Sequence, residues 1–553
     1  MFKRDQKPTV IITGASGFVG KYLVDFLKDE YHIIGIARRS RTESGITYHP
    51  NLDWVQWDVA NDKLFNQVLG YIIGKGRADY LIHLAGYYNF DYSDNDEYER
   101  TNVHGTKNIL ELARKINVRH FIFASSLAAL KFVGSNGLPL SEKEKLIEDF
   151  AYAKSKKAGE EMCLEYSRHF KCSVVRFAAV FSDWCEYAPL YKFLETWLSK
   201  RWESRILAGK GQSAVSYIHI NDLSKLLKSI ISHSARLKDF EVFHASPNGC
   251  TSHLDLFLIS TRDYFGSSLK PVFLPKFLAY PGIVAKNILG KFGLMPVAFE
   301  RPWMVKYIDE KLNIDSTYTQ MTLNWQPAPR LSVERRLLYL LINMKSHHQE
   351  WIMKNEELIR RVTMRPNLKI YEYLLQLQDN ILDKLIKRVM TDQEATIFEN
   401  FRRMDWREFN SHISQLYFLI MASVRSSDRS IMIKYIEDLA LAHFAAGFTS
   451  EEVTSLLYLF NNIIIDELTA IKELSGFRQE IYDNIGLSIQ LAIDETENIY
   501  ENLEEKLSPE KLASLKSLKQ REIRKAFIEK LSTFYHDTEE NQTENQSEPP
   551  TIL

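Results

Sequence analysis

Short apolar runs alternate with segments of helical periodicity over about the first 260 residues. Such runs predict buried strands, and apolar residues that recur every three or four positions predict amphipathic helices. Helical patterns fill residues 102–115 and 152–170. Because this alternation indicates βαβ units, we expect an α/β fold with a doubly wound, mostly parallel sheet and helices on both faces. The candidate strands cover residues 10–12, 32–37, 80–85, 120–124 and 172–180.

Residues 186–340 are less regular and carry aromatic and proline residues between short apolar segments. This pattern predicts a small substrate lobe interleaved with the last strands, so we place the first domain at residues 1–340. The residues that set this region apart are Trp197, Trp202, Trp303, Trp325, Pro271, Pro275, Pro281, Pro296 and Pro302.

After about residue 365 prolines vanish between Pro366 and Pro509, and helical periodicity takes over. Gly447 indicates a helix end, and the run from Thr449 to Glu452 resembles a capping box that opens a helix over 453–474. Ser508-Pro509 indicates another helix start. We therefore expect an all-α domain of about six helices at 366–536, a linker at 341–365 and a disordered tail at 537–553. One apolar stripe contains Leu374, Leu375, Ile381, Leu382, Leu385, Ile386 and Val389.

Composition limits the class of protein. The net charge of −1 gives no long-range attraction to nucleic acid or to an anionic membrane, so we expect no nucleic-acid partner. The four cysteines lack metal-site spacing, which favours reduced thiols and a cytoplasmic location, and no metal site is expected. The apolar stretch 277–285 is too short for a transmembrane segment and is interrupted by Pro281-Gly282, so we interpret it as a pocket lid or a surface-docking loop.

A glycine-rich turn follows the first candidate strand. In the sequence VIITGASGFVG, Gly14, Gly17 and Gly20 suit a tight turn, close approach of the backbone to a pyrophosphate, and close packing of helix on strand. The helix that begins there presents free N–H groups and a partial positive charge to phosphates. We expect a dinucleotide site of the Rossmann type, formed by Gly14, Ser16, Gly17, Phe18, Val19 and Gly20.

Candidate catalytic residues lie in the same region. Tyr152 and Lys156 are four residues apart on a predicted helix and share one face. A nearby ammonium favours the phenolate, so we expect Lys156 to lower the pKa of Tyr152 and make it a proton donor or acceptor for a carbonyl or alcohol. Ser126, with Ser125, follows the candidate strand at 120–124 and can hold the substrate oxygen.

These motifs, in this order, resemble the extended branch of the short-chain dehydrogenase/reductase superfamily, the NAD(P)-dependent epimerase/dehydratase-like proteins. The resemblance covers about residues 8–340. It implies catalytic roles for Ser126, Tyr152 and Lys156, with Lys156 also holding the nicotinamide ribose, and a homodimer formed through two helices of each protomer. It further implies that the cofactor is contacted by Asp58, Val59, Leu84, Ala85, Gly86, Asn102, Tyr152 and Lys156.

The residues after the second candidate strand bear on cofactor choice. NAD-preferring sites place a carboxylate there to bind the ribose 2′-hydroxyl. This chain has Arg38 and Arg39, which suit a 2′-phosphate through charge-assisted hydrogen bonds. The alternative is a pair of solvated surface arginines. We expect NADP(H) to be favoured, with NAD(H) as the alternative.

The substrate is less defined than the cofactor. Ser126 precedes Leu127-Ala128-Ala129 rather than the acidic pair of sugar dehydratases, and Arg176-Phe177 stands where many relatives have Arg-Pro. The leading interpretation is an NAD(P)-dependent oxidoreductase acting on a carbonyl or alcohol of an apolar small molecule. The alternatives are a nucleotide-sugar epimerase with bound NAD and a cofactor-binding redox sensor with little turnover. The complete set of Ser126, Tyr152 and Lys156 argues against a pure sensor.

The helical half contains no metal or nucleophile motif. His443 lies on an apolar helix, where a core histidine is the favoured interpretation and a haem ligand the alternative. The segment LAHFAAGFTSEEVTSLLYLFNNIIIDEL resembles the N-terminal helical sensory domain of stressosome co-antagonist regulators. The resemblance implies signal reception, dimerisation or docking of a protein partner. The simpler alternative is a helical bundle that extends a dimer interface.

Overall fold

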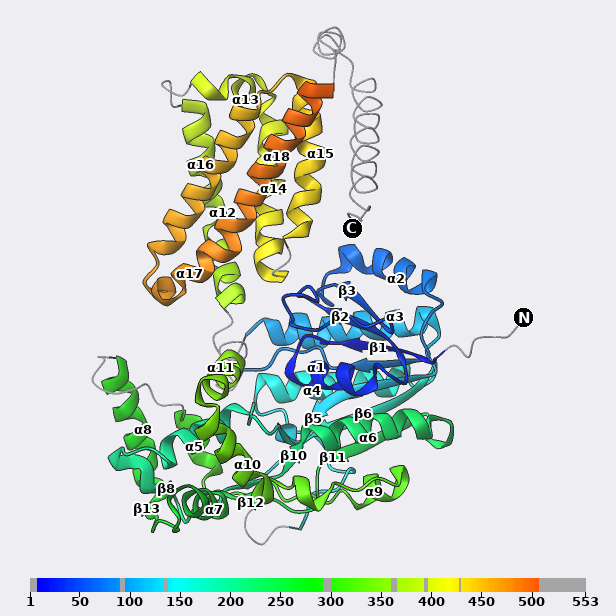
Figure 1. Cartoon of the computed structure of the whole chain (residues 1–553), viewed down its shortest axis with the longest axis vertical. Helices are drawn as coiled ribbons and strands as arrows, with labels where there is room; N and C mark the ends of the chain where they lie inside the picture. Colours follow the sequence, from blue (N-terminus) through cyan, green and yellow to red (C-terminus); the bar gives the residue numbers. More distant parts are fainter. Residues whose placement is uncertain are drawn as a thin grey trace, which may run out of the picture. The chain divides into compact units, whose positions relative to one another are not determined.

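The computed structural model describes residues 7–89, 95–132, 138–291, 300–359, 366–391, 396–426 and 429–506 of the 553-residue chain. The chain forms two compact units, Met1–Met364 and Arg365–Leu553 (Figure 1). The predicted helix start at Ser508-Pro509 and the predicted tail at 537–553 lie outside the described residues.

A parallel sheet of seven described strands forms the centre of the first unit, in the order β11-β6-β5-β4-β1-β2-β3. Every neighbouring pair is parallel, which confirms the predicted fold class. In β1 the side chains of Val10, Ile11 and Ile12 are all buried, as expected for a strand covered on both faces. The strands are β1 (Thr9–Thr13), β2 (His32–Ala37), β3 (Leu52–Gln56), β4 (Tyr80–His83), β5 (His120–Ser126), β6 (Lys171–Phe177) and β11 (Phe240–Ala245).

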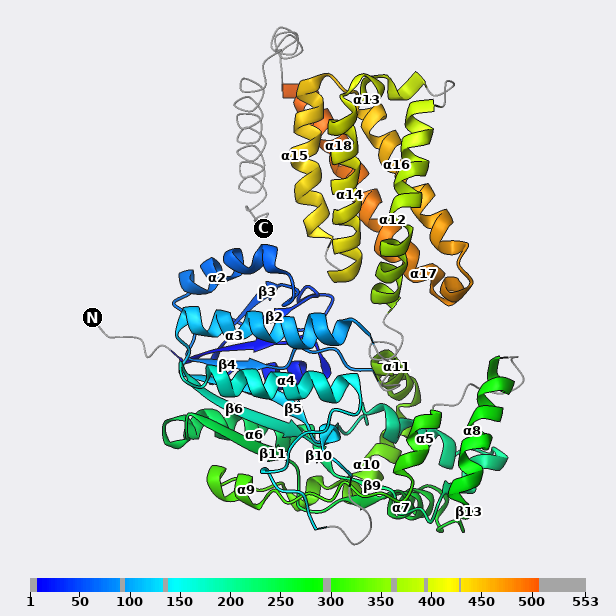
Figure 2. The same cartoon turned by 180° about the vertical axis from the view of Figure 1, so that it is seen from behind.

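Helices cover both faces of this sheet (Figures 1 and 2). On one face α1 (Phe18–Leu27) packs beside α6 (Ile220–His233) over one apolar core. On the other face lie α2 (Phe65–Gly74), α3 (Gly105–Ile116) and α4 (Ala151–Tyr166) over a second core. Since β1 lies between β2 and β4, the strand order reverses there, and the crevice at the carboxyl ends of the strands is the expected ligand site.

A second layer of short elements lies in the region predicted to be a substrate lobe. Pairing of β7 with β10 and of β8 with β13 places segments far apart in sequence side by side. Residues 341–359 of the expected linker form the end of α10 and then α11, and Trp351 of α11 is buried. The elements are β7 (Ala179–Phe181), α5 (Ala188–Trp197), β8 (Ile206–Ala208), β10 (Tyr217–His219), α7 (His253–Phe265), β13 (Val272–Leu274), α8 (Lys276–Lys291), α9 (Thr317–Leu323), α10 (Val333–Ser346) and α11 (His348–Ile359).

The second unit is helical around one apolar core. Gly447 ends α15 with a φ of 86°, a left-handed conformation that glycine adopts without strain. The Thr449 side chain accepts a hydrogen bond from the Glu452 N–H, which confirms the predicted cap, although the helix covers Ser450–Thr469 rather than 453–474. The described helices are α12 (Pro366–Thr391), α13 (Glu399–Arg403), α14 (Trp406–Ser426), α15 (Ser430–Ala446), α16 (Ser450–Thr469), α17 (Arg478–Ile481) and α18 (Leu487–Lys506).

Several predicted boundaries differ from the structure. The candidate strand at 172–180 is broken into β6 and β7, and the helix predicted over 152–170 ends at Tyr166. The helix predicted to start at 102 begins with a π-helical segment, Tyr98–His104, before α3. The strands β3 and β11 were not predicted, because polar residues such as Asp53 and Glu241 interrupt their apolar runs.

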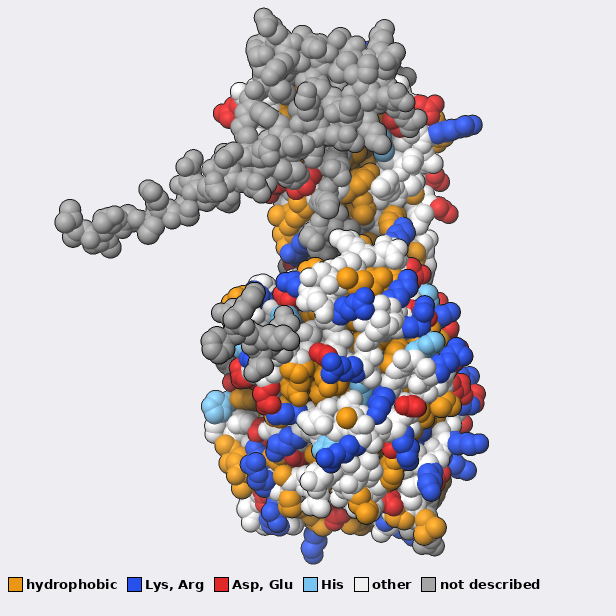
Figure 3. Space-filling model, turned by 90° about the vertical axis from the view of Figure 1, so that its right-hand side faces the viewer, with side chains coloured by type: hydrophobic (Ala, Val, Ile, Leu, Met, Phe, Trp, Pro, Cys, Tyr) orange, Lys and Arg blue, Asp and Glu red, His pale blue; other side chains and the backbone are white. Residues whose placement is uncertain are grey.

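The surface of the first unit is mixed in charge. Figure 3 shows lysine and arginine side chains scattered among acidic and hydrophobic ones on the face it presents. None of the helices in the described ranges is long and apolar enough to cross a membrane. Within the same ranges no group of three or more His, Cys, Asp or Glu residues could hold a metal ion.

Candidate active site

The glycine-rich turn between β1 and α1 forms a cradle that only glycine fits. Gly14 has a φ of 68°, and a Cβ there would lie 2.7 Å from the backbone nitrogen of Ala85. A Cβ on Gly20 would collide with the Gly14 carbonyl oxygen. Gly17 precedes α1, and no side chain caps this helix start, so its backbone N–H groups are available to an anion. The turn therefore fits the pyrophosphate of a dinucleotide.

The end of β4 lies against this turn. The backbone N–H of Ala85 donates to Thr13 Oγ1 over 3.2 Å. Beside it, a Cβ on Gly86 would lie 3.4 Å from Asn102 Oδ1 and 3.8 Å from Lys156 Nζ. The structure thus brings Gly86, Asn102 and Lys156 together, as the resemblance implied.

Asn102 connects two elements of the site. Its Nδ2 donates to the Tyr87 carbonyl oxygen and to Ser155 Oγ, both over 2.9 Å. Because Tyr87 follows β4 and Ser155 lies on α4, Asn102 holds the β4 loop against the helix that carries Tyr152 and Lys156.

The two arginines after β2 are in different situations. Arg39 Nη2 donates to the Ser16 carbonyl oxygen over 2.7 Å, so its guanidinium lies on the phosphate-binding turn. Arg38 is anchored through its backbone, whose carbonyl oxygen accepts from Gln56 Nε2 over 2.9 Å. Both side chains are half-buried rather than fully solvated.

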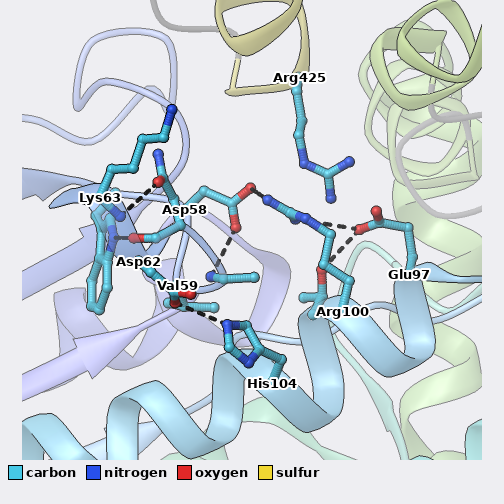
Figure 4. A network of polar contacts seen from close by, with 12 residues as sticks. Asp58, Val59, Asp62, Lys63, Glu97, Arg100, His104 and Arg425 are labelled. Atoms are coloured by element: carbon cyan, nitrogen blue, oxygen red, sulfur yellow. Dashed lines mark hydrogen bonds and ion pairs between the residues drawn. The ribbon is translucent and has the colours of Figure 1, made fainter. Parts of the chain in front are cut away.

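Asp58 lies beyond the end of β3 and belongs to a polar network (Figure 4). Its Oδ1 accepts from the Ala60 N–H over 3.1 Å, and its Oδ2 pairs with Arg100 Nη2 over 2.9 Å. The neighbouring Val59 carbonyl oxygen accepts from Asn108 Nδ2. The network fixes the loop after β3 to the segment before α3, and contact of Asp58 and Val59 with the cofactor stays a prediction.

The three candidate catalytic side chains meet at the carboxyl end of β5. Ser126 ends this strand, and its side chain is hydrogen-bonded to the phenol of Tyr152. Lys156 Nζ lies 5.7 Å from the centre of the Tyr152 ring and donates to the Ala124 carbonyl oxygen over 2.8 Å. Tyr152 and Lys156 come from the same face of α4, as their spacing predicted.

The electrostatics of this group differ from the sequence-based expectation. Burial raises the pKa of Tyr152 to about 12, although the hydrogen bond with Ser126 opposes this rise. Burial lowers the pKa of Lys156 to about 8, while the charge of Glu160 acts in the opposite direction. Lys156 therefore does not lower the pKa of Tyr152 as predicted. The phenol keeps its proton at neutral pH, which suits donation to a developing alkoxide.

A buried ion pair supports the site and was missed by the sequence analysis. Arg176 Nε and Nη2 donate to the two carboxylate oxygens of Glu160 over 3.0 and 2.8 Å. Ser125 Oγ donates to the same carboxylate over 2.5 Å. Glu160 lies one turn after Lys156 on α4, so the spacing Tyr152, Lys156, Glu160 was a signal that could have identified it.

A cavity of about 960 Å³ opens above these residues. Its walls are mainly aromatic and aliphatic, and the ring centre of Tyr88 lies 4.7 Å from that of Tyr152. The stretch predicted as a lid or docking loop is part of α8 and contributes to the wall. Among the described lining residues the charged ones are Lys156, Glu186, Glu203, Lys286, Glu300 and Glu310.

The fold and the glycine-rich turn are those of a Rossmann-type dinucleotide-binding protein, and Phe18 and Val19 line the cavity. Residues 10–245 match the model of the NAD dependent epimerase/dehydratase family, so this part of the chain is similar to that family. The description of this family names NAD, and the cofactor of this chain stays a prediction.

Curated relatives resemble the same part of the chain. A protein of Methanocaldococcus jannaschii described as "Putative UDP-glucose 4-epimerase" is 27% identical over 39% of this chain and 71% of its own length. A "Putative dihydroflavonol 4-reductase" of Synechocystis sp. is 33% identical over 28% of this chain and 43% of its own. UDP-glucuronate 4-epimerase 4 of Arabidopsis thaliana is 25% identical over 39% of this chain and 52% of its own.

Among solved structures, the crystal structure of a UDP-glucose 4-epimerase from Thermotoga maritima with UDP-glucose is 20% identical. It has a TM-score of 0.47 and covers 62% of this chain and 99% of its own.

Proposed function

We propose that the protein is an NAD(P)-dependent oxidoreductase that transfers hydride between its cofactor and a carbonyl or alcohol carbon of a large, apolar, uncharged molecule. The character of the cavity carries this proposal. A volume of about 960 Å³ is at the upper end for small-molecule sites, and its walls offer apolar rather than ionic contacts.

The charges at the cavity argue against a nucleoside diphosphate substrate. Four of the six charged lining residues in the described ranges are glutamates, which repel a pyrophosphate. Of the two lysines, Lys286 pairs with Glu203 over 3.0 Å, and Lys156 is bonded to the Ala124 carbonyl oxygen. A neutral substrate avoids this repulsion.

The side chains at the cavity floor have separate tasks. The bound cofactor supplies or accepts hydride. Tyr152 gives its proton to the carbonyl oxygen during reduction, Ser126 orients that oxygen, and Lys156 stabilises the negative charge that develops. The raised pKa of Tyr152 favours the reduction direction, because the phenol is protonated at neutral pH.

The position of Arg39 supports a preference for NADP(H). Its guanidinium lies on the phosphate-binding turn. Arg39 follows β2, and in this fold a residue after the second strand usually contacts the adenine ribose. A 2′-phosphate placed there gains a charge-assisted contact that NAD(H) cannot make.

The second candidate is a nucleotide-sugar 4-epimerase that retains NAD. The names of several relatives favour it, because they describe UDP-sugar 4-epimerases. In that case oxidation and reduction would alternate on one substrate, with no net consumption of cofactor.

A comparison of substrate classes tests the proposal. The purified full chain is offered reduced cofactor with a set of polycyclic and long-chain ketones, and separately offered UDP-glucose and UDP-glucuronate. We expect oxidation of the reduced cofactor with an apolar ketone and no change in the nucleotide sugars. Conversion of a UDP-sugar without cofactor turnover, together with inactivity on every ketone, would overturn the proposal in favour of the epimerase. Cofactor binding without turnover on either class would overturn it in favour of a redox sensor.

A further inference from the structure

Large apolar side chains are exposed on the outer side of the substrate lobe. Phe277 of α8 is 76% exposed and Trp202, just before β8, is 74% exposed. Val272 and Phe273 of the paired strand β13 are exposed as well. Figure 1 shows α8, β8 and β13 together at one edge of the first unit. Large apolar side chains that are exposed on neighbouring elements mark an interaction site.

Helix α8 has two apolar faces. Ala279, Ile283 and Lys286 line the cavity on its inner face. Phe277, Tyr280 and Ile288 recur at helical spacing on the opposite face, and all three are exposed. None of these three side chains lines the cavity, so the outer face serves a purpose other than holding the substrate.

Basic residues outnumber acidic ones around this helix, although Glu203 next to Trp202 pairs with Lys286. No acidic residue occurs between Asp263 and Glu300, whereas this stretch contains Lys270, Lys276, Lys286 and Lys291. Lys200 and Arg201 directly precede Trp202, and both are exposed. The chain as a whole has a net charge of −1, so the positive charge is a local property of the apolar surface.

We propose that this surface, formed by Trp202, Val272, Phe273, Phe277, Tyr280 and Ile288, docks on a membrane that contains anionic phospholipids. A helix with apolar and aromatic residues on one face, flanked by lysines, lies in the plane of a membrane interface. Aromatic residues favour the headgroup level, and each nearby lysine or arginine adds attraction to anionic lipid.

Docking there places the cavity next to the bilayer. Trp202 belongs both to the exposed surface and to the cavity lining, and α8 separates the two with its opposite faces. An apolar substrate can then pass from the bilayer into the cavity without crossing water. This last step rests on the proposed function, whereas membrane docking itself does not.

Flotation of the full chain with vesicles tests the inference without any substrate. We expect the chain to float with vesicles of phosphatidylcholine and phosphatidylglycerol, less with phosphatidylcholine alone, and less at high salt. The double variant Phe277→Asp, Tyr280→Asp should lower the bound fraction about tenfold or more, because two apolar anchors become anionic. Lys200→Gln with Lys270→Gln should weaken binding and flatten its salt dependence.

The matched control is Met321→Asp, which changes a side chain on α9 that is 79% exposed and outside the proposed surface. It should float like the wild type, and thermal unfolding should show that all variants are folded. Failure of the wild type to float, or an equal loss in the control, would overturn docking. A concentration-dependent dimer that the double variant abolishes, without vesicle binding, would assign the surface to a second copy of the chain instead. Neither result would affect reduction of a ketone dispersed in water, so the proposed function is tested separately.

Discussion

The guanidinium of Arg39 donates a hydrogen bond to the backbone carbonyl oxygen of Ser16 over 2.7 Å. This contact joins the end of β2 to the turn between β1 and α1, which are the two places where a dinucleotide of this fold type is held. Arg39 is thus positioned by the protein itself before it meets any phosphate.

Replacement of Arg39 should change cofactor choice. In Arg39→Ala we expect the Kd for NADPH to rise about 10- to 100-fold, since a charge-assisted hydrogen bond contributes about 1.5–3 kcal/mol, while the Kd for NADH changes little. Titration followed by cofactor fluorescence measures both constants. Arg38→Ala is the neighbouring control and should have the smaller effect. Equal losses for the two cofactors in Arg39→Ala would exclude Arg39 as a 2′-phosphate ligand.

The Glu160–Arg176 pair should be important for the stability of the first unit. In Glu160→Gln the Arg176 guanidinium stays buried without its counter-charge, so we expect the free energy of unfolding to fall by about 3–5 kcal/mol. Denaturant unfolding measures this change. Lys157→Gln, which removes the pair between Lys157 of α4 and the exposed Glu148 before this helix, is the control and should leave the unfolding midpoint unchanged. Similar unfolding midpoints for both variants would show that the buried pair contributes little to the free energy of unfolding.

The pH dependence of reduction should follow Lys156. Burial lowers its pKa to about 8, so its positive charge is lost as the pH rises through that value. Tyr152, with a pKa of about 12, remains protonated over this range. We expect kcat/KM for ketone reduction to be level near neutral pH and to fall above about pH 8. A rate that rises steadily through pH 8–10 would indicate that a phenolate, rather than the protonated phenol, is the active form.

His443 should make the second unit sensitive to acid. It is 4% exposed, neither ring nitrogen has a hydrogen-bond partner in the described part of the chain, and burial lowers its pKa to about 3. The unfolded chain, with a histidine pKa of about 6.5, binds the proton that the folded unit excludes, so stability falls as the pH drops below about 6.5.

We therefore expect His443→Leu to raise the free energy of unfolding by about 1 kcal/mol at neutral pH, because unpaired buried nitrogens are removed. The gain over the wild type should grow toward pH 5, as measured by denaturant unfolding. Tyr458→Leu, an exposed position on α16, is the control and should show no such growth. A gain that is independent of pH would mean that folding does not lower the pKa of His443.

The sequence was sufficient where local pattern determines structure. The prediction of β2 at 32–37 matches its bounds, and the glycine turn and the Tyr152–Lys156 face were predicted because their spacing alone defines them. His443 lies in the core between Phe401 and Phe448, in agreement with the favoured interpretation.

The features that the sequence did not predict depend on tertiary contacts. Glu160 and Arg176 come from a helix and a strand, and no periodicity indicates that they meet. The pKa of Tyr152 moved in the opposite direction from the prediction, because burial raises it more than the hydrogen bond with Ser126 lowers it, and burial is a property of the assembled fold. The inner and outer faces of α8 likewise depend on where the cavity lies in the assembled fold.

The most direct test of the central claim is a single-turnover measurement of reduced cofactor with an apolar ketone, in the wild type and in Tyr152→Phe. The wild type should oxidise the cofactor, whereas Tyr152→Phe should bind it with an unchanged Kd and react about 100- to 10,000-fold more slowly, since its proton donor is gone. Equal rates in the two proteins would contradict the role of Tyr152 and with it the proposed reaction.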